Sequence, residues 1–306
     1  MSLLVTGSIG IDTVETPSGR ADDVLGGSSI YFSLAAALFT NVRLVGVVGE
    51  DFDERLLEPL RRKGVDVSGV EVRKGSRTFR WHGRYHEDIN ERDTVSVELN
   101  VLAERGATIP ERFADSTHVF LANTHPALQA QTAARFHDAR LIVLDTMDLW
   151  INTERGALRG ALSKTHGVVL NDGEARLLSG KPNLVTAGRA ILELGPRFVV
   201  IKKGEHGSML VSRDDLFLAP PYLTERTIDP TGCGDTFAGA MMGYLAQQGR
   251  HDRLALRAAM ARGSVVASFV IESFSIDALA AVTAGDVERR LAELRRLAAF
   301  EGAETR

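Results

Sequence analysis

Short, almost continuously apolar runs alternate along the chain with longer segments in which apolar residues recur at helical spacing. Apolar runs of strand length are typical of strands that are buried on both faces of a sheet. Strands are predicted at residues 3–9, 42–48, 65–72, 117–122, 139–145, 167–170, 198–201 and 209–211. Helices are predicted at residues 51–63, 254–271 and 284–299, and from Asp235 to a C-terminus at Gly249. This alternation predicts an α/β fold with a central, mostly parallel sheet flanked by helices.

One segment breaks the pattern. Residues 73–101 are rich in charge and contain period-two stretches, which predicts an inserted β hairpin or small sheet. An insertion of this kind at the ligand edge of an α/β fold acts as a lid that excludes water. Its candidates for contact with a substrate are Trp81, Arg84, Tyr85 and Asp88. The alternative is that the aromatic rings pack the lid against the core and the charges are solvated.

The same segment raises the question of a metal site. His82 and His86 lie four residues apart with acidic neighbours. On a strand this spacing separates them by roughly 13 Å, which is too far for one ion. We therefore expect no metal site at these histidines.

The stretch at residues 229–247, DPTGCGDTFAGAMMGYLAQ, predicts a phosphate-handling loop that leads into a helix. Gly232 and Gly234 let the backbone turn tightly beside a ligand, and the unpaired N–H groups at the helix start attract an anion. Asp235 lies beside that anion site, where a carboxylate can accept a proton from a substrate hydroxyl. The alternative is that Asp235 only caps the helix and the glycines only form a turn.

Composition narrows the classes of function. The chain has 306 residues, 44% apolar and 25% charged, with a formal net charge of −4. This balance gives no electrostatic reason to expect a nucleic acid or an anionic membrane as a partner. The single cysteine, Cys233, cannot form an internal disulfide, and no apolar run reaches the length of a membrane span. The first residues carry no basic region before an apolar stretch, so we expect a cytoplasmic protein.

Two motifs resemble the signatures of one family. DPTGCGDTFAGA is similar to the second signature of the ribokinase family, the PfkB-type carbohydrate kinases, and GGSSIYFSLAAALF is similar to the first. The resemblance spans essentially the whole chain. It implies one ribokinase-like kinase domain over residues 1–306, with a β lid formed by segments at about 13–25 and 73–101. It also implies ATP as phosphate donor and Mg²⁺ as cofactor.

The resemblance assigns roles around the second signature. The family's base is the Asp after the Gly-rich loop, which implies Asp235 as general base and the amides of Gly232, Cys233 and Gly234 as the anion hole. Near a helix N-terminus a thiolate is favoured, so we expect alkylation of Cys233 to block phosphate binding and bound ATP to protect it.

On the acceptor side, a GxxxxD start, a Gly pair and a lid supply the family's substrate contacts. The resemblance and the positions of strand ends together give Asp12, Gly26, Gly27, Tyr31, Trp81, Arg84 and Asn123 as expected substrate-binding residues. This chain departs from many sugar kinases at Tyr31, where they carry Asn, and from ribokinase itself at Ser28, where it carries Lys.

On the nucleotide side, KKGEHG resembles the family's turn that lines the nucleotide, and NDGE resembles its NxxE element. The expected cofactor-binding residues are Asn171, Lys202, Gly204, Gly207, Thr231 and Ser264. Asn171 and Glu174 are expected to hold Mg²⁺ through water, although the same spacing also makes a helix capping box. The resemblance implies a K⁺ site at Asp229, although Glu272, Ser273 and Phe274 replace the usual Gly-Ala nearby.

Taken together, these features predict an ATP-dependent kinase. The charged lid sequence RYHEDINERDT suits a hydroxyl-rich acceptor, so we expect a sugar or related polyol, with a nucleoside as the alternative. A third interpretation is a ligand-binding homologue without turnover, but the base, the loop and the NxxE pair are all intact. A homodimer formed through the lid is a further implication of the resemblance. No GxxxxGK[ST] motif and no GxGxxG motif follows the first strand, which excludes P-loop and dinucleotide enzymes.

Overall fold

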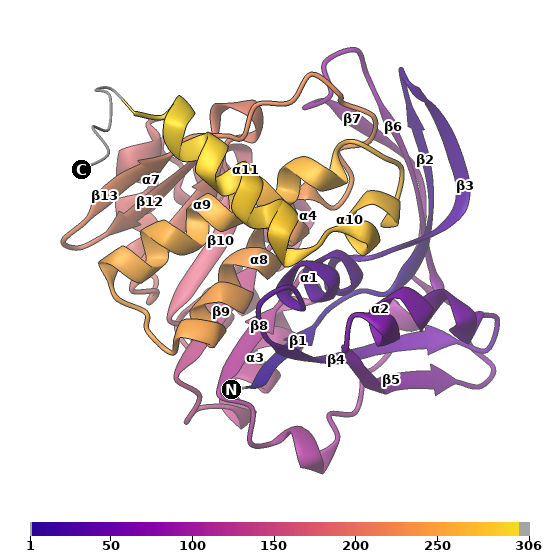
Figure 1. Ribbon diagram of the computed structural model, residues 1–306. Helices are drawn as coiled ribbons and strands as arrows, with labels where there is room; N and C mark the ends of the chain where they lie inside the picture. The colour runs from indigo at the N-terminus through magenta and orange to yellow at the C-terminus, as the bar shows by residue number, and fades with distance from the viewer. Residues whose placement is uncertain (1, 300–306) are drawn as a thin grey trace.

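The computed structural model describes residues 2–299; Met1 and residues 300–306 of the expected domain lie outside this range. A nine-stranded sheet runs through its centre in the order β13-β12-β11-β10-β9-β8-β1-β4-β5 (Figure 1). Its strands are β1 (Ser2–Thr6), β4 (Asn41–Gly49), β5 (Asp66–Arg73), β8 (His118–Leu121), β9 (Leu141–Asp145), β10 (Gly167–Asn171), β11 (Phe198–Lys202), β12 (Ser208–Ser212) and β13 (Leu216–Ala219). The strands from β11 to β5 pair in parallel, whereas β12 is antiparallel to both of its neighbours. The mostly parallel sheet predicted from the apolar runs is confirmed.

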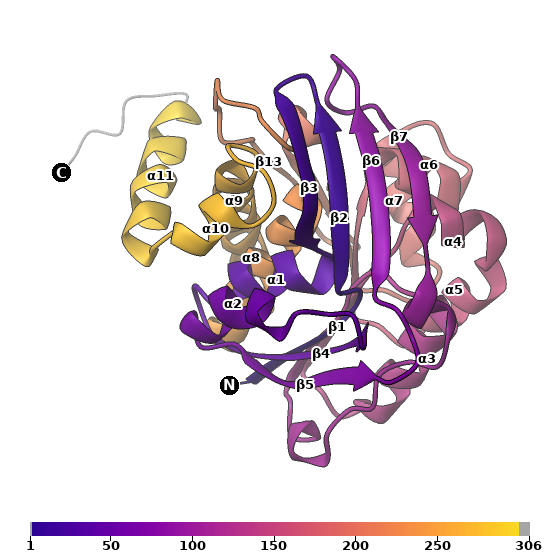
Figure 2. The same cartoon turned by 90° about the vertical axis from the view of Figure 1, so that its right-hand side faces the viewer.

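Helices cover both faces of this sheet (Figures 1 and 2). One layer contains α1 (Ser28–Ala36), α2 (Glu58–Arg62), α8 (Cys233–Gln248), α9 (Arg253–Val270), α10 (Asp277–Ala281) and α11 (Ala284–Leu297). The other contains α3 (Pro126–Arg135), α4 (Asp148–Thr153), α5 (Arg155–Leu162), α6 (Asp172–Ser179) and α7 (Leu184–Leu192). Single turns of 3₁₀ helix occur at η1 (Glu54–Leu57), η2 (Asn100–Ala103), η3 (Glu111–Phe113) and η4 (Gly204–His206).

Every strand of the large sheet except the edge strands β5 and β13 supplies two hydrophobic cores, one on each face. In β1, Leu3 and Val5 pack under the α1, α8 and α9 layer, while Leu4 packs under the opposite layer. Because successive side chains of a strand point to opposite faces, burial of both faces requires the uninterrupted apolar runs seen in the sequence. None of the helices in residues 2–299 is long and apolar enough to cross a membrane.

Helix α8 is held in place by close backbone packing against α1. A Cβ atom at Gly239 would lie 2.3 Å from the carbonyl oxygen of Phe32, and one at Gly243 would lie 2.7 Å from that of Ala36. Only residues without side chains allow this approach. The packing fixes where the N-terminus of α8 emerges at the edge of the sheet.

A second, four-stranded sheet stands over one edge of the molecule, as Figure 2 shows, and we call it the lid. Its strands are β2 (Gly10–Thr16), β3 (Gly19–Gly26), β6 (Phe79–Tyr85) and β7 (Arg92–Glu98), in the order β3-β2-β6-β7. The small sheet expected from the charged insertion is therefore present. Asp12 pairs in register with Trp81, so both side chains lie on the same face of the lid.

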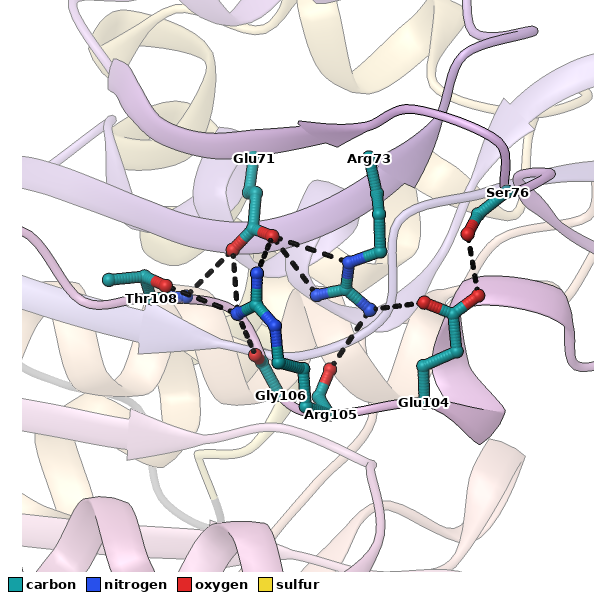
Figure 3. A network of polar contacts seen from close by, with 7 residues as sticks. All are labelled: Glu71, Arg73, Ser76, Glu104, Arg105, Gly106 and Thr108. Carbon is teal, nitrogen blue, oxygen red and sulfur yellow. Dashed lines mark hydrogen bonds and ion pairs between the residues drawn. The ribbon is translucent and has the colours of Figure 1, made fainter.

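Polar contacts tie together the two ends of the inserted segment. Figure 3 shows Glu71 accepting hydrogen bonds from Arg73 and Arg105, while Arg73 also donates to Glu104. Ser76 donates to Glu104, which joins the chain entering the lid to the chain leaving it. These contacts anchor the base of the lid beside β5.

Two predicted boundaries need correction. The strand predicted at residues 3–9 ends at Thr6, and the helix predicted at 51–63 is split into η1 and α2. Asp53 caps η1 by accepting from the N–H of Arg55. Pro59 lies in the first turn of α2, where a residue without an N–H group is tolerated.

Candidate active site

The polar strand ends predicted from the sequence meet at one edge of the large sheet. Asn123 follows β8, Asp145 ends β9, Asn171 ends β10 and Lys202 ends β11. Because these strands are parallel neighbours, their carboxyl ends share the edge at which α/β folds bind ligands. The N-terminus of α8 points to the same place, since a Cβ atom at Gly234 would lie 2.9 Å from Nζ of Lys202.

The loop before α8 has the geometry expected of an anion site. Gly232 precedes the helix with φ of 76°, a left-handed conformation that favours glycine. A Cβ atom there would lie 2.4 Å from the ring of Tyr31, which is only 1% exposed. Tyr31 thus lies beneath the loop as a support for Gly232, rather than as an accessible stacking surface.

Asp235 lies in the first turn of α8 in a strongly electrostatic setting. Burial, together with the charge of Asp145, raises its pKa to about 7, while Lys202 and Arg92 oppose the shift. Lys202 lies 3.5 Å from Asp145. Burial alone would lower the pKa of Lys202, but the carboxylates of Asp145, Glu174 and Asp235 outweigh burial and raise it. A carboxylate with a pKa near neutrality is well suited to exchange a proton with a hydroxyl.

Asp12 reaches the site from the lid strand β2. It is 4% exposed, and its Oδ1 has no hydrogen-bond partner among the described residues. Burial, with the charges of Asp229 and Asp235, raises its pKa to about 7. Gly26 leaves room for the carboxylate, because a Cβ atom there would lie 1.8 Å from Oδ2. An unpartnered buried oxygen of this kind is suited to accept a hydrogen bond from a substrate hydroxyl. Gly27, with φ of 101°, continues this turn into α1.

We expect Asp12→Asn to raise the KM for the acceptor by about 10- to 100-fold, the equivalent of one hydrogen bond to a charged group. Turnover at saturating acceptor should change less, because the base is intact. Thr13→Ala, on the opposite face of the same strand, is the matched control for steady-state kinetics. Equal acceptor KM values for Asp12→Asn and the wild type would show that Asp12 does not bind the acceptor.

The lid side chains divide between two faces. Trp81 lies over Gly83 on the face of Asp12, with its indole Nε1 donating to Oγ1 of Thr94 at 3.3 Å. Tyr85 lies on that face as well and accepts a hydrogen bond from Oγ1 of Thr231 at 3.2 Å. This contact joins the lid to the Gly-rich loop before α8.

Arg84 lies on the opposite face, which points away from Asp12. There its Nε donates to Glu15 at 2.6 Å, and Glu15 also pairs with His82. The structure therefore does not bring Arg84 together with the other expected acceptor residues. Asp88 lies in the turn between β6 and β7, which we call the lid tip. It accepts hydrogen bonds from the backbone and the side chain of Asn90.

Asn123 lies at the expected strand end, but both ends of its amide are already engaged. Its Oδ1 accepts from the indole of Trp150 at 3.0 Å, and its Nδ2 lies 3.0 Å from Sδ of Met147. Contact with an acceptor would require these partners to be exchanged.

Two glycines shape the turn after β11 that is expected to line a nucleotide. Gly204 and Gly207 have φ of 53° and 78°, and a Cβ atom at Gly207 would lie 2.2 Å from the carbonyl oxygen of Ala219. Ser264, on α9, donates to the carbonyl oxygen of Pro220 nearby. Asp229 is 1% exposed and accepts from the N–H groups of Thr231 and Ser275.

Asn171 and Glu174 form the capping box that the sequence left open as an alternative. The Asn171 side chain accepts from the Glu174 N–H, and Glu174 accepts from the Asn171 N–H, both at 2.7 Å. Burial raises the pKa of Glu174 to about 7, against the opposing charge of Lys202. In residues 2–299 no three His, Cys, Asp or Glu side chains form a group that could hold a metal ion.

The structure does not support the favoured thiolate expected at Cys233, whereas the expected effect of its alkylation stays a prediction. Burial raises the pKa of the Cys233 thiol well above its usual range, and the charges of Asp229 and Asp235 add to the shift. The helix N-terminus favours a thiolate, but two carboxylates and an apolar setting outweigh it.

Three further residues reach the site, and sequence analysis did not identify them as site residues. Asp145 was recognised as a strand end, but its ion pair with Lys202 depends on the order of β9, β10 and β11 in the sheet. Arg92 and Asn90 lie near the lid tip, where a Cβ atom at Gly204 would lie 2.7 Å from Oδ1 of Asn90. Only the pairing of β7 with β6 shows which lid residues face inward.

Comparisons with known proteins agree with this geometry. Residues 25–280 match the model of the pfkB family of carbohydrate kinases. Over 255 residues the chain is 32% identical to a cytidine kinase of Thermococcus kodakarensis, which covers 82% of this chain and 89% of that protein.

Two solved structures share the fold. A putative ribokinase II from E. coli in complex with ATP and Mg²⁺ aligns with a TM-score of 0.77 at 19% identity, over 95% of this chain and 99% of that one. A Burkholderia thailandensis nucleoside kinase in complex with inosine aligns with a TM-score of 0.76 at 20% identity, over 95% and 98%. With a family match across most of its length and this strand-edge site, the chain belongs to the pfkB family of carbohydrate kinases and is a kinase that acts on a sugar or nucleoside hydroxyl.

Proposed function

We propose that the protein transfers the γ-phosphoryl group of ATP to an acceptor hydroxyl at the edge formed by β8 to β11 and α8. The observation that carries this proposal is Asp235, with a pKa of about 7, in the first turn of a helix that begins at a Gly-rich loop. The acceptor proton passes to Asp235 as its oxygen bonds to the γ-phosphorus. The bond to the bridging oxygen breaks, and ADP leaves with the electron pair. The amides of Gly232, Cys233 and Gly234 stabilise the charge on the transferring group.

The donor set fits magnesium in its hydrated form. Asn171 and Glu174 supply oxygens at the end of β10, with Asp145 close by at the end of β9. Mg²⁺ usually keeps several waters and binds through one or two carboxylates together with substrate phosphates, so a complete protein cage is unnecessary. Magnesium would supply neutralisation of phosphate charge, while Lys202 supplies a fixed positive charge beside Gly234.

We further propose a nucleoside as the preferred acceptor, although the sequence favoured a sugar or polyol. The argument for a sugar depended on the charged lid, but Arg84 and His82 are paired with Glu15 on the outer face. The inner face instead presents the half-buried ring of Trp81 beside Asp12, and an indole ring can stack on a base. The 32% identity to a cytidine kinase favours the same class.

Steady-state kinetics with ATP and Mg²⁺ test both proposals. The panel is cytidine, adenosine, inosine, ribose, other pentoses, hexoses and glycerol. A specificity constant for one nucleoside at least about tenfold above every sugar would support the nucleoside, and the reverse order would favour the sugar. ATP binding without turnover on any acceptor would support the non-catalytic alternative.

Three further expectations remain proposals. We place the enzyme in the cytoplasm, where ATP is abundant. A K⁺ site at Asp229 predicts faster turnover in potassium than in tetramethylammonium chloride. A homodimer through the lid predicts twice the monomer mass in light scattering, and β7 offers a free strand edge for pairing.

A further inference from the structure

We infer that Arg92, carried by the lid strand β7, is a further catalytic residue that contacts the transferring phosphoryl group from the side opposite Lys202. The inference rests on the proposed kinase function. Its basis is the position of Arg92 beside two contacts between the lid and the large domain. One contact is made with the Gly-rich loop before α8, and the other with the turn after β11.

Both touching points lie close to Arg92 in the chain. Tyr85 meets the anion loop through its hydrogen bond with Thr231, and the Asn90 side chain lies against Gly204 at the nucleotide turn. The segment from Tyr85 to Arg92 therefore extends from the acceptor side to the donor side of the site.

The side chain of Arg92 is on the inner face of the lid. Arg92 pairs in register with Tyr85 across the β6–β7 ladder, so the two side chains lie on the same face. Its guanidinium lies 5.7 Å from the centre of the Trp81 ring. Its positive charge also lowers the pKa of the Tyr85 hydroxyl and of the Asp235 carboxylate, which agrees with this inward position.

The charge of Arg92 is available to a ligand. Among the described residues it has no carboxylate within 4.0 Å. The other lid arginines are neutralised by acidic partners, as Arg80 is by Asp23 at 2.6 Å. Lys202, the other cation that acts on Asp235, is already paired with Asp145.

The site needs such a cation. Several ionisable groups from different elements influence the charge of Asp235: Asp12 from β2, Arg92 from β7, Asp145 from β9, Lys202 from β11 and Cys233 from α8. With Asp235 itself counted, three carboxylates stand against the two cations Arg92 and Lys202, and Lys202 is already paired with Asp145. The transferring group adds further negative charge. An arginine that reaches the phosphoryl oxygens offsets this charge as the phosphorus–oxygen bond breaks.

The test compares Arg92→Met and Arg92→Lys with Arg80→Met, a matched lid arginine on the outer face. We expect Arg92→Met to lower kcat by about 10- to 100-fold, the equivalent of one or two charge-assisted hydrogen bonds. The KM values for ATP and acceptor should stay within about threefold, and Arg92→Lys should recover part of the loss. The acidic limb of the kcat/KM profile should move to higher pH, because loss of the cation raises the pKa of Asp235.

A binding measurement separates this inference from the proposed function, because it needs no turnover. Calorimetry compares ADP·Mg²⁺ alone with ADP·Mg²⁺ plus aluminium fluoride, a mimic of the transferring group. In the wild type, aluminium fluoride should increase the affinity for ADP·Mg²⁺. In Arg92→Met this increase should be at least about tenfold smaller, and the affinity for ADP·Mg²⁺ alone should be unchanged. Equal gains in Arg92→Met and Arg80→Met would overturn the inference, as would a lower melting temperature of Arg92→Met that fully accounts for lost activity.

Discussion

Asp235→Asn should lower turnover by about two to four orders of magnitude while ATP binding stays nearly intact, the range expected for loss of a general base. Asparagine keeps the shape of the side chain but cannot accept the acceptor proton. Rapid-quench measurement of product, with ATP affinity determined by calorimetry, checks both halves of this result. A variant that kept more than half of wild-type turnover would show that Asp235 is only a helix cap.

The same variant has a predictable effect on stability. The folded-state pKa of about 7 exceeds the ordinary value of 3.8, so the folded protein binds this proton more tightly than the unfolded chain. The stabilisation from that proton is present below about pH 4 and is lost as the pH rises through 7. Asp235→Asn should therefore melt no lower than the wild type at pH 8. A markedly lower melting temperature would mean that lost turnover reflects unfolding.

Gly232→Ala should be the second most damaging change. Alanine at φ of 76° costs roughly 1–2 kcal/mol of backbone strain, and its Cβ would lie 2.4 Å from the Tyr31 ring, so the loop or the ring must move. Because an anion hole needs its N–H groups correctly placed, turnover should fall by about 10²-fold or more. Single-turnover kinetics and differential scanning calorimetry measure the two effects.

Gly160→Ala is the matched control for that experiment. Gly160 lies within α5, and a Cβ atom there would have no neighbour within 4 Å. Alanine should preserve turnover and stabilise the protein, because it favours a helix more than glycine does. If Gly232→Ala behaved like Gly160→Ala, the loop would have no role in phosphoryl transfer.

The sequence predicted the framework of the site because local patterns encode it. Strands buried on both faces need apolar runs, and their parallel order brings Asp145 and Lys202 to one edge. The loop before α8 was equally readable, since Gly232 needs a left-handed conformation that other residues rarely adopt.

What the sequence did not predict depends on distant neighbours. The inward position of Arg92 requires the β6–β7 register, including its irregularity between His82 and Gly83. The high pKa of Cys233 depends on burial and on Asp229 and Asp235, whereas the sequence showed only a nearby helix start. Local spacing cannot report such long-range packing and electrostatics.

The parallel pairing of β2 with β6 has a consequence for the order of folding. It joins Gly10 to Phe79, and all of α1, β4 and β5 lies between them in the chain. Closing so long a loop costs entropy that is lower once the intervening strands and helix have already folded. Asp12 and Trp81 therefore come together late, so catalytic competence should appear after most of the hydrophobic core has formed during refolding.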